Sequence, residues 1–186
     1  MSRILLVYGT REGHTARIAE EIATTMRAEG HEVDVRDLQH TPAPSIDGYD
    51  AVLVGASVHA RGYEHEVRHW VGARAGELAR LPNGFFSVSL SAANHDAKSV
   101  AEMDEVIKHF SMKTGWWPQH VARFAGALVY SQYNWMMKRV MRWIVRHESD
   151  DDFSDMTRDY DLTDYAEVAA FAKSFADMAR TAEALR

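Results

Sequence analysis

The feature that most constrains the fold is a regular alternation of short apolar runs with helix-like segments along nearly the whole chain. Runs rich in β-branched and aliphatic residues are typical of strands, and the sequence predicts five of them: 3–8, 31–38, 50–57, 84–91 and 123–130. Strands that are apolar nearly throughout and alternate with helices indicate a mostly parallel sheet covered by helices on both faces. The second run alternates Val33 and Val35 with charged residues, which predicts a more exposed strand.

Apolar residues at helical spacing fill the intervals between these runs. The predicted helices carry them at Ile18, Ile22 and Met26, at Val67, Trp70, Val71, Leu78 and Leu81, at Val100, Met103, Val106, Ile107 and Phe110, and at Val168, Phe171, Ala172, Phe175 and Met178. We therefore expect one α/β domain over residues 1–186, built on a doubly wound five-stranded parallel sheet with the strand order 2-1-3-4-5. Ligands of such sheets bind outside the carboxyl ends of the strands, where the winding reverses.

The stretch between the fifth strand and the last helix, about 131–162, is too long for a plain connection and predicts a helical insertion. Residues 134–147 separate apolar side chains from the basic residues Lys138, Arg139, Arg142 and Arg146 on a helical wheel. Three roles fit this amphipathic pattern: a helix packed on the domain, a helix lying on anionic lipid, or a wall of a path for an apolar substrate.

Composition excludes several classes of protein. The chain has no cysteine, which excludes disulfides, thiol nucleophiles and cysteine-ligated iron–sulfur clusters. The net charge of −6 argues against nucleic-acid binding. No stretch reaches the roughly 18 apolar residues of a spanning helix, and the start "MSRILLVYGT" lacks the pattern of a signal peptide. We therefore expect a cytoplasmic protein.

The loop after the first predicted strand has the character of a phosphate site. It contains Thr10, Arg11, Glu12, Gly13, His14 and Thr15. A helix that begins at this point presents unpaired backbone N–H groups and the positive end of its dipole to an anion. The two threonine hydroxyls add hydrogen-bond donors, the arginine adds a positive charge, and the glycine lets the backbone approach a ligand closely. The alternative is an ordinary turn with Thr15 as the helix N-cap, and neither the P-loop pattern nor the dinucleotide fingerprint is present.

Two further loops are expected at the same edge of the sheet. The third strand ends in Ala56, Ser57, Val58 and His59, and the fourth in Ser89, Leu90, Ser91 and Ala92. Small residues with polar caps suit backbone contacts to a planar ring, which His59, Tyr63 or His95 would stack on or cap. Ordinary strand-exit loops are the alternative for each segment taken alone.

The segment "HEVRH", 65–69, matches the zinc-binding pattern H-E-x-x-H. A catalytic zinc site needs a third protein ligand, and no convincing one follows in the chain. We interpret the match as a coincidence in a chain with ten histidines and expect no metal.

The loop 10–15, with "GASVHARGY", "FFSVSLS", "AGALVYSQYNWMMKRVMRWI" and "TRDYDLTDY", resembles the flavodoxin-like, menaquinone-dependent protoporphyrinogen oxidase family over nearly the full length. The resemblance implies an FMN protein of haem biosynthesis on the cytoplasmic face of the inner membrane. It would oxidise protoporphyrinogen IX to protoporphyrin IX with a quinone as electron acceptor. Loop 10–15 would hold the FMN phosphate, and the loops near Ser57 and Ser89 the flavin edge. The chain departs from the family pattern at Glu12, where flavodoxins have a hydroxyl, and at 147–151.

Several points stay open at this level. Arg61, Lys138 and Arg139 are expected to meet the propionates of the substrate through charge-assisted hydrogen bonds. A flavodoxin-type electron carrier and a flavin NAD(P)H:quinone reductase are the alternative functions. Peripheral membrane contact through 134–147 and a homo-oligomer are also left open.

Overall fold

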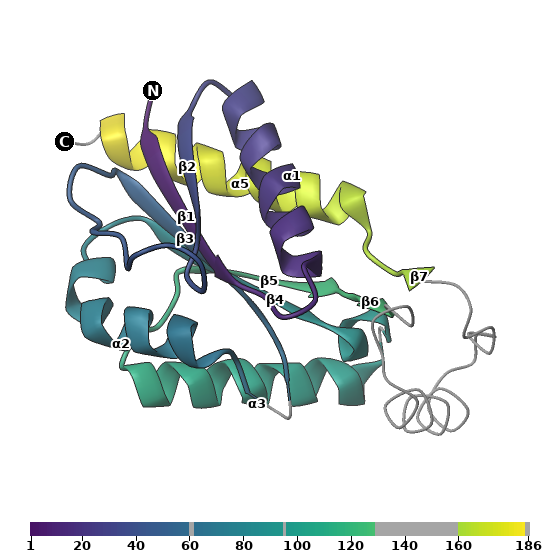
Figure 1. Cartoon of the computed structure of the whole chain (residues 1–186). Helices are drawn as coiled ribbons and strands as arrows, with labels where there is room; N and C mark the ends of the chain where they lie inside the picture. Colours follow the sequence, from purple (N-terminus) through teal and green to yellow (C-terminus); the bar gives the residue numbers. More distant parts are fainter. Residues whose placement is uncertain (60–61, 95, 129–159, 185–186) are drawn as a thin grey trace.

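The computed structural model describes residues 1–59, 62–94, 96–128 and 160–184 (Figure 1). Its main sheet has five parallel strands in the order β2-β1-β3-β4-β5, which confirms the predicted order 2-1-3-4-5. These strands are β1 (Arg3–Gly9), β2 (Glu32–Asp37), β3 (Ala51–Ser57), β4 (Asn83–Ser89) and β5 (His120–Ala125). The doubly wound α/β class is therefore confirmed.

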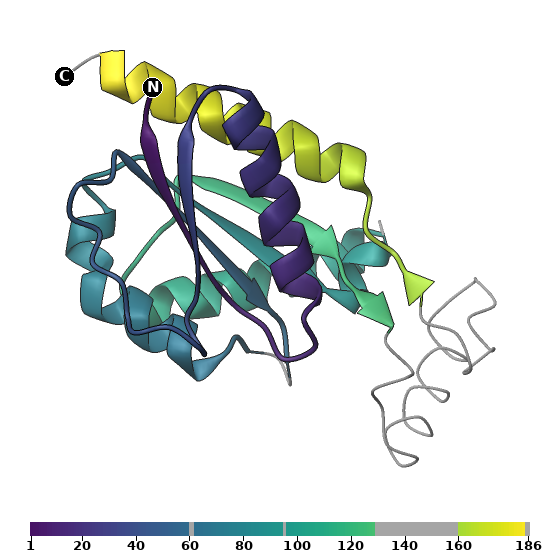
Figure 2. The same cartoon turned by 45° about the horizontal axis from the view of Figure 1, so that its top comes forward.

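Two helices cover each face of the sheet. Helices α1 (His14–Ala28) and α5 (Tyr165–Ala184) lie side by side on one face, and α2 (His65–Leu78) and α3 (Ala97–Thr114) on the other (Figures 1 and 2). Because of this double cover, every residue of β4 is buried, and in β3 only the last residue is partly exposed. In the edge strand β2 only Val33 is buried, which confirms the prediction of a more exposed strand.

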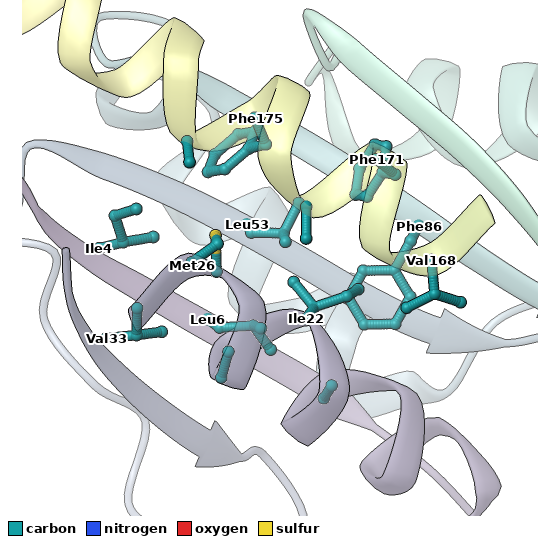
Figure 3. Packing of buried hydrophobic residues seen from close by; sticks show 14 of the residues in the cluster. Ile4, Leu6, Ile22, Met26, Val33, Leu53, Phe86, Val168, Phe171 and Phe175 are labelled. Atoms are coloured by element: carbon teal, nitrogen blue, oxygen red, sulfur yellow. The ribbon is translucent and has the colours of Figure 1, made fainter. Parts of the chain in front are cut away.

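The core divides into two layers by the faces of the sheet. On one face, Ile22 and Met26 of α1 and Phe171 and Phe175 of α5 pack over the strands (Figure 3). On the other face the layer is aromatic, with Phe85, Phe110 and Trp116 in edge-on and stacked contacts. Both layers pack on the strands whose carboxyl ends meet at one edge of the sheet.

Two strand ends differ from their predictions. The fourth predicted strand, 84–91, ends at Ser89, because the Ser89 hydroxyl accepts from the Ala92 N–H (3.2 Å) and starts the short 3₁₀ helix η1 (Leu90–Ala93). The fifth predicted strand, 123–130, is shifted. It pairs with β4 from His120 to Ala125, and the ladder stops where β4 stops.

The residues after β5 belong to a separate ribbon. Strand β6 (Ala127–Leu128) pairs antiparallel with β7 (Tyr160–Asp161). The Gly126 N–H donates to Ser89 O (3.0 Å), and Gly126 O accepts from the Leu162 N–H (3.2 Å). The two ends of the predicted insertion are thus joined beside the exit of β4. The rest of the insertion, with Lys138, Arg139 and the helix predicted over 134–147, lies outside the described residues, as do Arg61 and His95.

None of the helices in the described part of the chain is long and apolar enough to cross a membrane.

His120 at the start of β5 gives a prediction about pH. Its ring stacks on Phe171 (centroids 4.8 Å apart), Nε2 makes no hydrogen bond to the described residues, and burial lowers the pKa of the imidazole. The unfolded chain therefore binds the proton more readily, so acidification below about pH 6.5 favours unfolding. Because His120→Phe keeps the stack and removes the unsatisfied nitrogen, we expect it to stabilise the protein by about 1 kcal/mol at pH 7, and by more at pH 5.5. Urea unfolding at both values measures this. An advantage that shrinks on acidification would contradict it.

Candidate functional site

The loop between β1 and α1 has the backbone of an anion site. Gly13 is the N-cap of α1 in the left-handed region (φ 80°), and its N–H donates to Thr10 Oγ1 (3.0 Å). The first intrahelical bond runs from the Arg17 N–H to Gly13 O (3.3 Å), so the N–H groups before it have no acceptor within the helix. A Cβ built at Gly13 meets nothing within 4 Å. Backbone donors therefore line an open space.

Thr15 does not cap the helix. It is the second residue of α1, its side chain is buried, and Oγ1 makes no hydrogen bond to any described residue. The N-cap alternative for Thr15 is thus wrong, since α1 begins at His14 after Gly13. A buried hydroxyl without a partner is unfavourable by about 1–3 kcal/mol and points to a ligand in this loop.

The side chains of the other loop residues differ in exposure. Arg11 is exposed and Glu12 is partly buried, while Thr10 is almost fully buried. The positive charge of Arg11 lowers the pKa of both His59 and Glu64, so Arg11 lies close to the loop after β3.

His14 is anchored to the chain that returns from the insertion. Its Nε2 donates to Thr163 Oγ1 (2.7 Å), and the Thr163 hydroxyl donates to Ala125 O (2.8 Å) at the end of β5. Asp161 lies 3.5 Å from Nε2 and accepts from Arg17 (3.0 Å). Sequence reasoning assigned no role to Thr163 and Asp161, because they are far from the loop along the chain. They fix the position of the start of α1 against β5 and β7.

The anchor can be tested through stability. We expect Thr163→Val to destabilise the protein by about 1–2 kcal/mol, because it removes both hydrogen bonds of a partly buried hydroxyl. Thr181→Val on the outer part of α5, where the exposed hydroxyl bonds Asp177 O, is the matched control and should stay within about 0.5 kcal/mol of the parent. Chemical denaturation of the parent, Thr163→Val and Thr181→Val measures the free energy of unfolding of each. Equal effects of the two substitutions would argue against the anchor.

The loop after β3 forms the second wall. Ala56 is buried, and Ser57 and Val58 are half-buried. The Val58 N–H donates to Val88 O (2.8 Å), and His59 closes a tight turn with Gly62 through two backbone hydrogen bonds of 2.7 and 2.9 Å. His59 itself is half-buried.

Glu64 is a buried acid beneath this loop that sequence reasoning missed. Its carboxyl accepts from Ser57 Oγ, and the other oxygen, Oε2, is buried with no hydrogen bond among the described residues. Burial raises the pKa of Glu64, although the hydrogen bond from Ser57 and the charge of Arg11 oppose this. A Cβ built at Gly9, the last residue of β1, would lie 3.3 Å from Glu64 Cβ and 2.6 Å from Val67 Cγ2. Glycine at the end of β1 thus makes room for Glu64.

The exit of β4 forms the third wall. The Ser89 hydroxyl is committed to the start of η1 and to Met103 Sδ (3.3 Å). Ala92 is buried, whereas Leu90 is half-buried and Ser91 exposed. Ser89 therefore shapes the loop through its side chain, and the residues after it present backbone to the edge of the sheet.

Tyr63 does not face the site. Its hydroxyl donates to Ser87 Oγ (2.9 Å), and its ring packs edge-on against Phe85 and Phe110 in the core. Burial raises the pKa of its phenol far above the usual value. The expectation that Tyr63 stacks on or caps a ligand ring is therefore wrong. Of the two predicted residues that the structure describes, His59 and Tyr63, only His59 lies at this edge.

The histidines of "HEVRH" lie in the first turns of α2. His65 and His69 are both exposed, with parallel rings whose centroids are 6.0 Å apart. No third His, Cys, Asp or Glu joins them in a metal-sized group within the described part of the chain.

Comparisons with known proteins agree with this geometry. The flavodoxin domain family matches residues 5–155. The chain is 28% identical over 176 residues to protoporphyrinogen IX dehydrogenase [quinone] of Escherichia coli strain K12, covering 95% of this chain and 96% of the relative. It is 32% identical over 175 residues to the protein of the same name from Leishmania major, covering 94% and 74%.

Solved structures share the fold at low sequence identity. Oxidised flavodoxin 1 of Bacillus cereus is similar with a TM-score of 0.52 and 13% identity, over 95% of this chain and 98% of that one. Rubredoxin oxygen:oxidoreductase of Desulfovibrio gigas gives a TM-score of 0.58 at 15% identity. Here 99% of this chain spans 37% of a longer protein.

Proposed function

The chain belongs to the flavodoxin domain family, and from this premise we propose that it is an FMN-dependent oxidoreductase that oxidises protoporphyrinogen IX with a quinone as electron acceptor. The cofactor that the family and the fold indicate is FMN. The substrate and the acceptor are proposed from the names of relatives that match along nearly the whole chain.

The residues of the β1–α1 loop fit a flavin phosphate. The observation that carries this is the buried, unpartnered Thr15 Oγ1 beside the open N-terminal turn of α1. A dianionic phosphate accepts hydrogen bonds from such groups, and the helix dipole favours its charge. Thr10, Gly13 and Thr15 would hold the phosphate, and Arg11 would add a positive charge at the rim.

The remaining residues bind and orient. FMN supplies an acceptor for a pair of electrons when it is bound. Backbone groups of Ala56–His59 and of Ser89–Ala92 would hold the ring at the carboxyl ends of β3 and β4, where doubly wound sheets bind ligands. Arg61, Lys138 and Arg139 are proposed to meet the substrate propionates, and 134–147 to contact the membrane. A single domain with an insertion over about 131–162 is part of the same proposal.

Anaerobic mixing tests the proposal. FMN-loaded protein is mixed with protoporphyrinogen IX while flavin absorbance is followed, with and without a menaquinone analogue. We expect the flavin to bleach with the porphyrinogen alone and to recover when the quinone is added. A flavin that stays oxidised rejects the substrate. Rapid exchange of electrons with a flavodoxin reductase would then favour an electron carrier, and direct oxidation of NAD(P)H a quinone reductase.

A further inference from the structure

Three polar side chains form a connected cluster at the exit of β3. His59 Nε2 lies 3.0 Å from Ser57 Oγ, and Ser57 Oγ donates to Glu64 Oε1. The direct distance from His59 Nε2 to Glu64 Oε1 is 3.6 Å, so the serine hydroxyl is the shorter path between them. The cluster runs from the cofactor edge of the sheet to the start of α2.

Exposure changes along the cluster from one end to the other. The side chain of His59 is 28% exposed and that of Glu64 is 1% exposed. Gly9 of β1 packs against the Glu64 side chain, so closely that a Cβ at Gly9 would lie 3.3 Å from Glu64 Cβ. A buried carboxyl is costly unless it has a use or a full set of hydrogen bonds, and Glu64 Oε2 has none among the described residues.

The hydrogen bonds fix the direction of the chain. A serine hydroxyl has one hydrogen, and Ser57 gives it to Glu64, so Ser57 Oγ accepts from His59 Nε2–H. In this neutral tautomer Nδ1 of His59 carries no hydrogen and is the free acceptor. His59 is therefore oriented to take up a proton at Nδ1 and to pass one on from Nε2.

We infer that His59, Ser57 and Glu64 form a proton relay that takes a proton from the reduced donor at the flavin edge and stores it on Glu64. The inference rests on the proposed function. His59 is the outer member, and Glu64 is a positioning residue, because it acts through Ser57 and His59.

The transfer balances without a further reagent. Oxidation removes two hydrogens from a C–H/N–H unit of the donor. Bound flavin would supply the acceptor for one of them together with the bonding electron pair, and the other leaves as a proton to His59 Nδ1. Nε2 then passes its proton to Ser57 Oγ, whose own hydrogen moves to Glu64 Oε1. The electrons leave later to the quinone.

The charges around the cluster favour this direction. Burial lowers the pKa of His59, and the charge of Arg11 lowers it further, so the ring is neutral and able to accept at pH 7. Burial raises the pKa of Glu64, so this carboxyl holds a proton more readily than an exposed glutamate does, while Ser57 and Arg11 lower its pKa in part. Tyr63 also lies beside Glu64, and the raised pKa of its phenol keeps it protonated throughout.

Nuclear magnetic resonance of the apoprotein tests the relay without flavin or substrate. We expect the His59 ring shifts to show two inflections with pH, its own and that of Glu64, because the two groups share one hydrogen-bond path. Glu64→Gln should remove the second inflection. Glu66→Gln, an exposed acid in the first turn of α2, should retain it. A single inflection shared by all three proteins overturns the relay.

Kinetics of the FMN-loaded protein give the second test. We expect Glu64→Gln to slow flavin reduction by the porphyrinogen about 100-fold at pH 7 with unchanged FMN affinity, and Ser57→Ala to slow it by a similar factor. Imidazole in the buffer should restore the rate of flavin reduction in His59→Ala, because this end of the relay is open to solvent. If His59 had only a structural role, added imidazole would not change that rate. Normal reduction rates in both variants refute the relay and leave the proposed function standing. If the parent protein binds FMN but its flavin is not reduced by the porphyrinogen, the proposed function fails. The nuclear magnetic resonance titration of the apoprotein still tests the relay in that case.

Discussion

Gly55→Ala is expected to destabilise the protein by about 3 kcal/mol. Gly55 lies in β3 beside its partner Phe86 of β4. A Cβ built at Gly55 would lie 2.0 Å from Phe86 Cζ and 2.5 Å from both Cε atoms. The ring is fully buried and packs against Phe124, so it has no free space to move into. Overpacking of this kind typically costs about 1–3 kcal/mol, and so short an overlap places Gly55 at the upper end.

The space argument has two controls. Phe86→Leu should relieve the overlap, so the double variant is expected to be more stable than the sum of the single effects, with a coupling of about 1 kcal/mol or more. Gly76→Ala in α2, where a Cβ meets nothing within 4 Å, should instead stabilise the protein by about 0.5–1 kcal/mol. Urea denaturation of the four variants gives the values. Additive effects of Gly55→Ala and Phe86→Leu would show that the ring is not what excludes the side chain.

Gly55 also illustrates what the sequence could predict and what it could not. Periodicity predicted the class and the exposed character of β2, because strands buried on both faces are apolar nearly throughout. The strand order followed from the five-stranded doubly wound architecture chosen for that class. It did not predict that a single ring on the neighbouring strand takes the place of a side chain at Gly55. Register and rotamer decide such a contact, and both depend on the neighbouring strand.

Strand ends were predicted less well for a related reason. The apolar run 123–130 continues through Gly126 without a break in character. The ladder nevertheless ends at Ala125, because β4 turns into η1 and β7 takes over as the partner of the next residues. Pairing with a segment some 30 residues further along the chain has no local signal.

The site was predictable where it is local. Loop 10–15 could be recognised from its position after a strand and its small and hydroxyl residues, which are properties of neighbouring positions. Glu64, Thr163 and Asp161 were missed because their roles arise from contacts across the fold with Ser57, His14 and Arg17. Tyr63 was misassigned because an aromatic residue near a site is equally suited to the core.

Thr15→Val should weaken FMN binding about 10- to 100-fold and leave the apoprotein as stable as before or slightly more stable. The loss of FMN affinity and the unchanged or higher stability of the apoprotein both follow from the same oxygen atom, Thr15 Oγ1. Without ligand, Thr15 Oγ1 is buried and unpartnered, so replacing it by a methyl group removes an unfavourable feature. With ligand, the same oxygen would donate to a phosphate, and a hydrogen bond to a charged group contributes about 1.5–3 kcal/mol.

Riboflavin provides the matched ligand for this prediction, because it carries the same ring and ribityl chain without the phosphate. Quenching of flavin fluorescence should show a loss of affinity for FMN only, and Thr24→Val, at an exposed position of the same helix, should bind both ligands like the parent. A loss shared equally by riboflavin would place Thr15 near the ring or the ribityl chain, and no loss for either would remove Thr15 from the site. Since Thr15 lies two residues after the left-handed Gly13, in the open N-terminal turn of α1, a selective loss would locate the phosphate at that turn and thereby orient the ring towards the exits of β3 and β4.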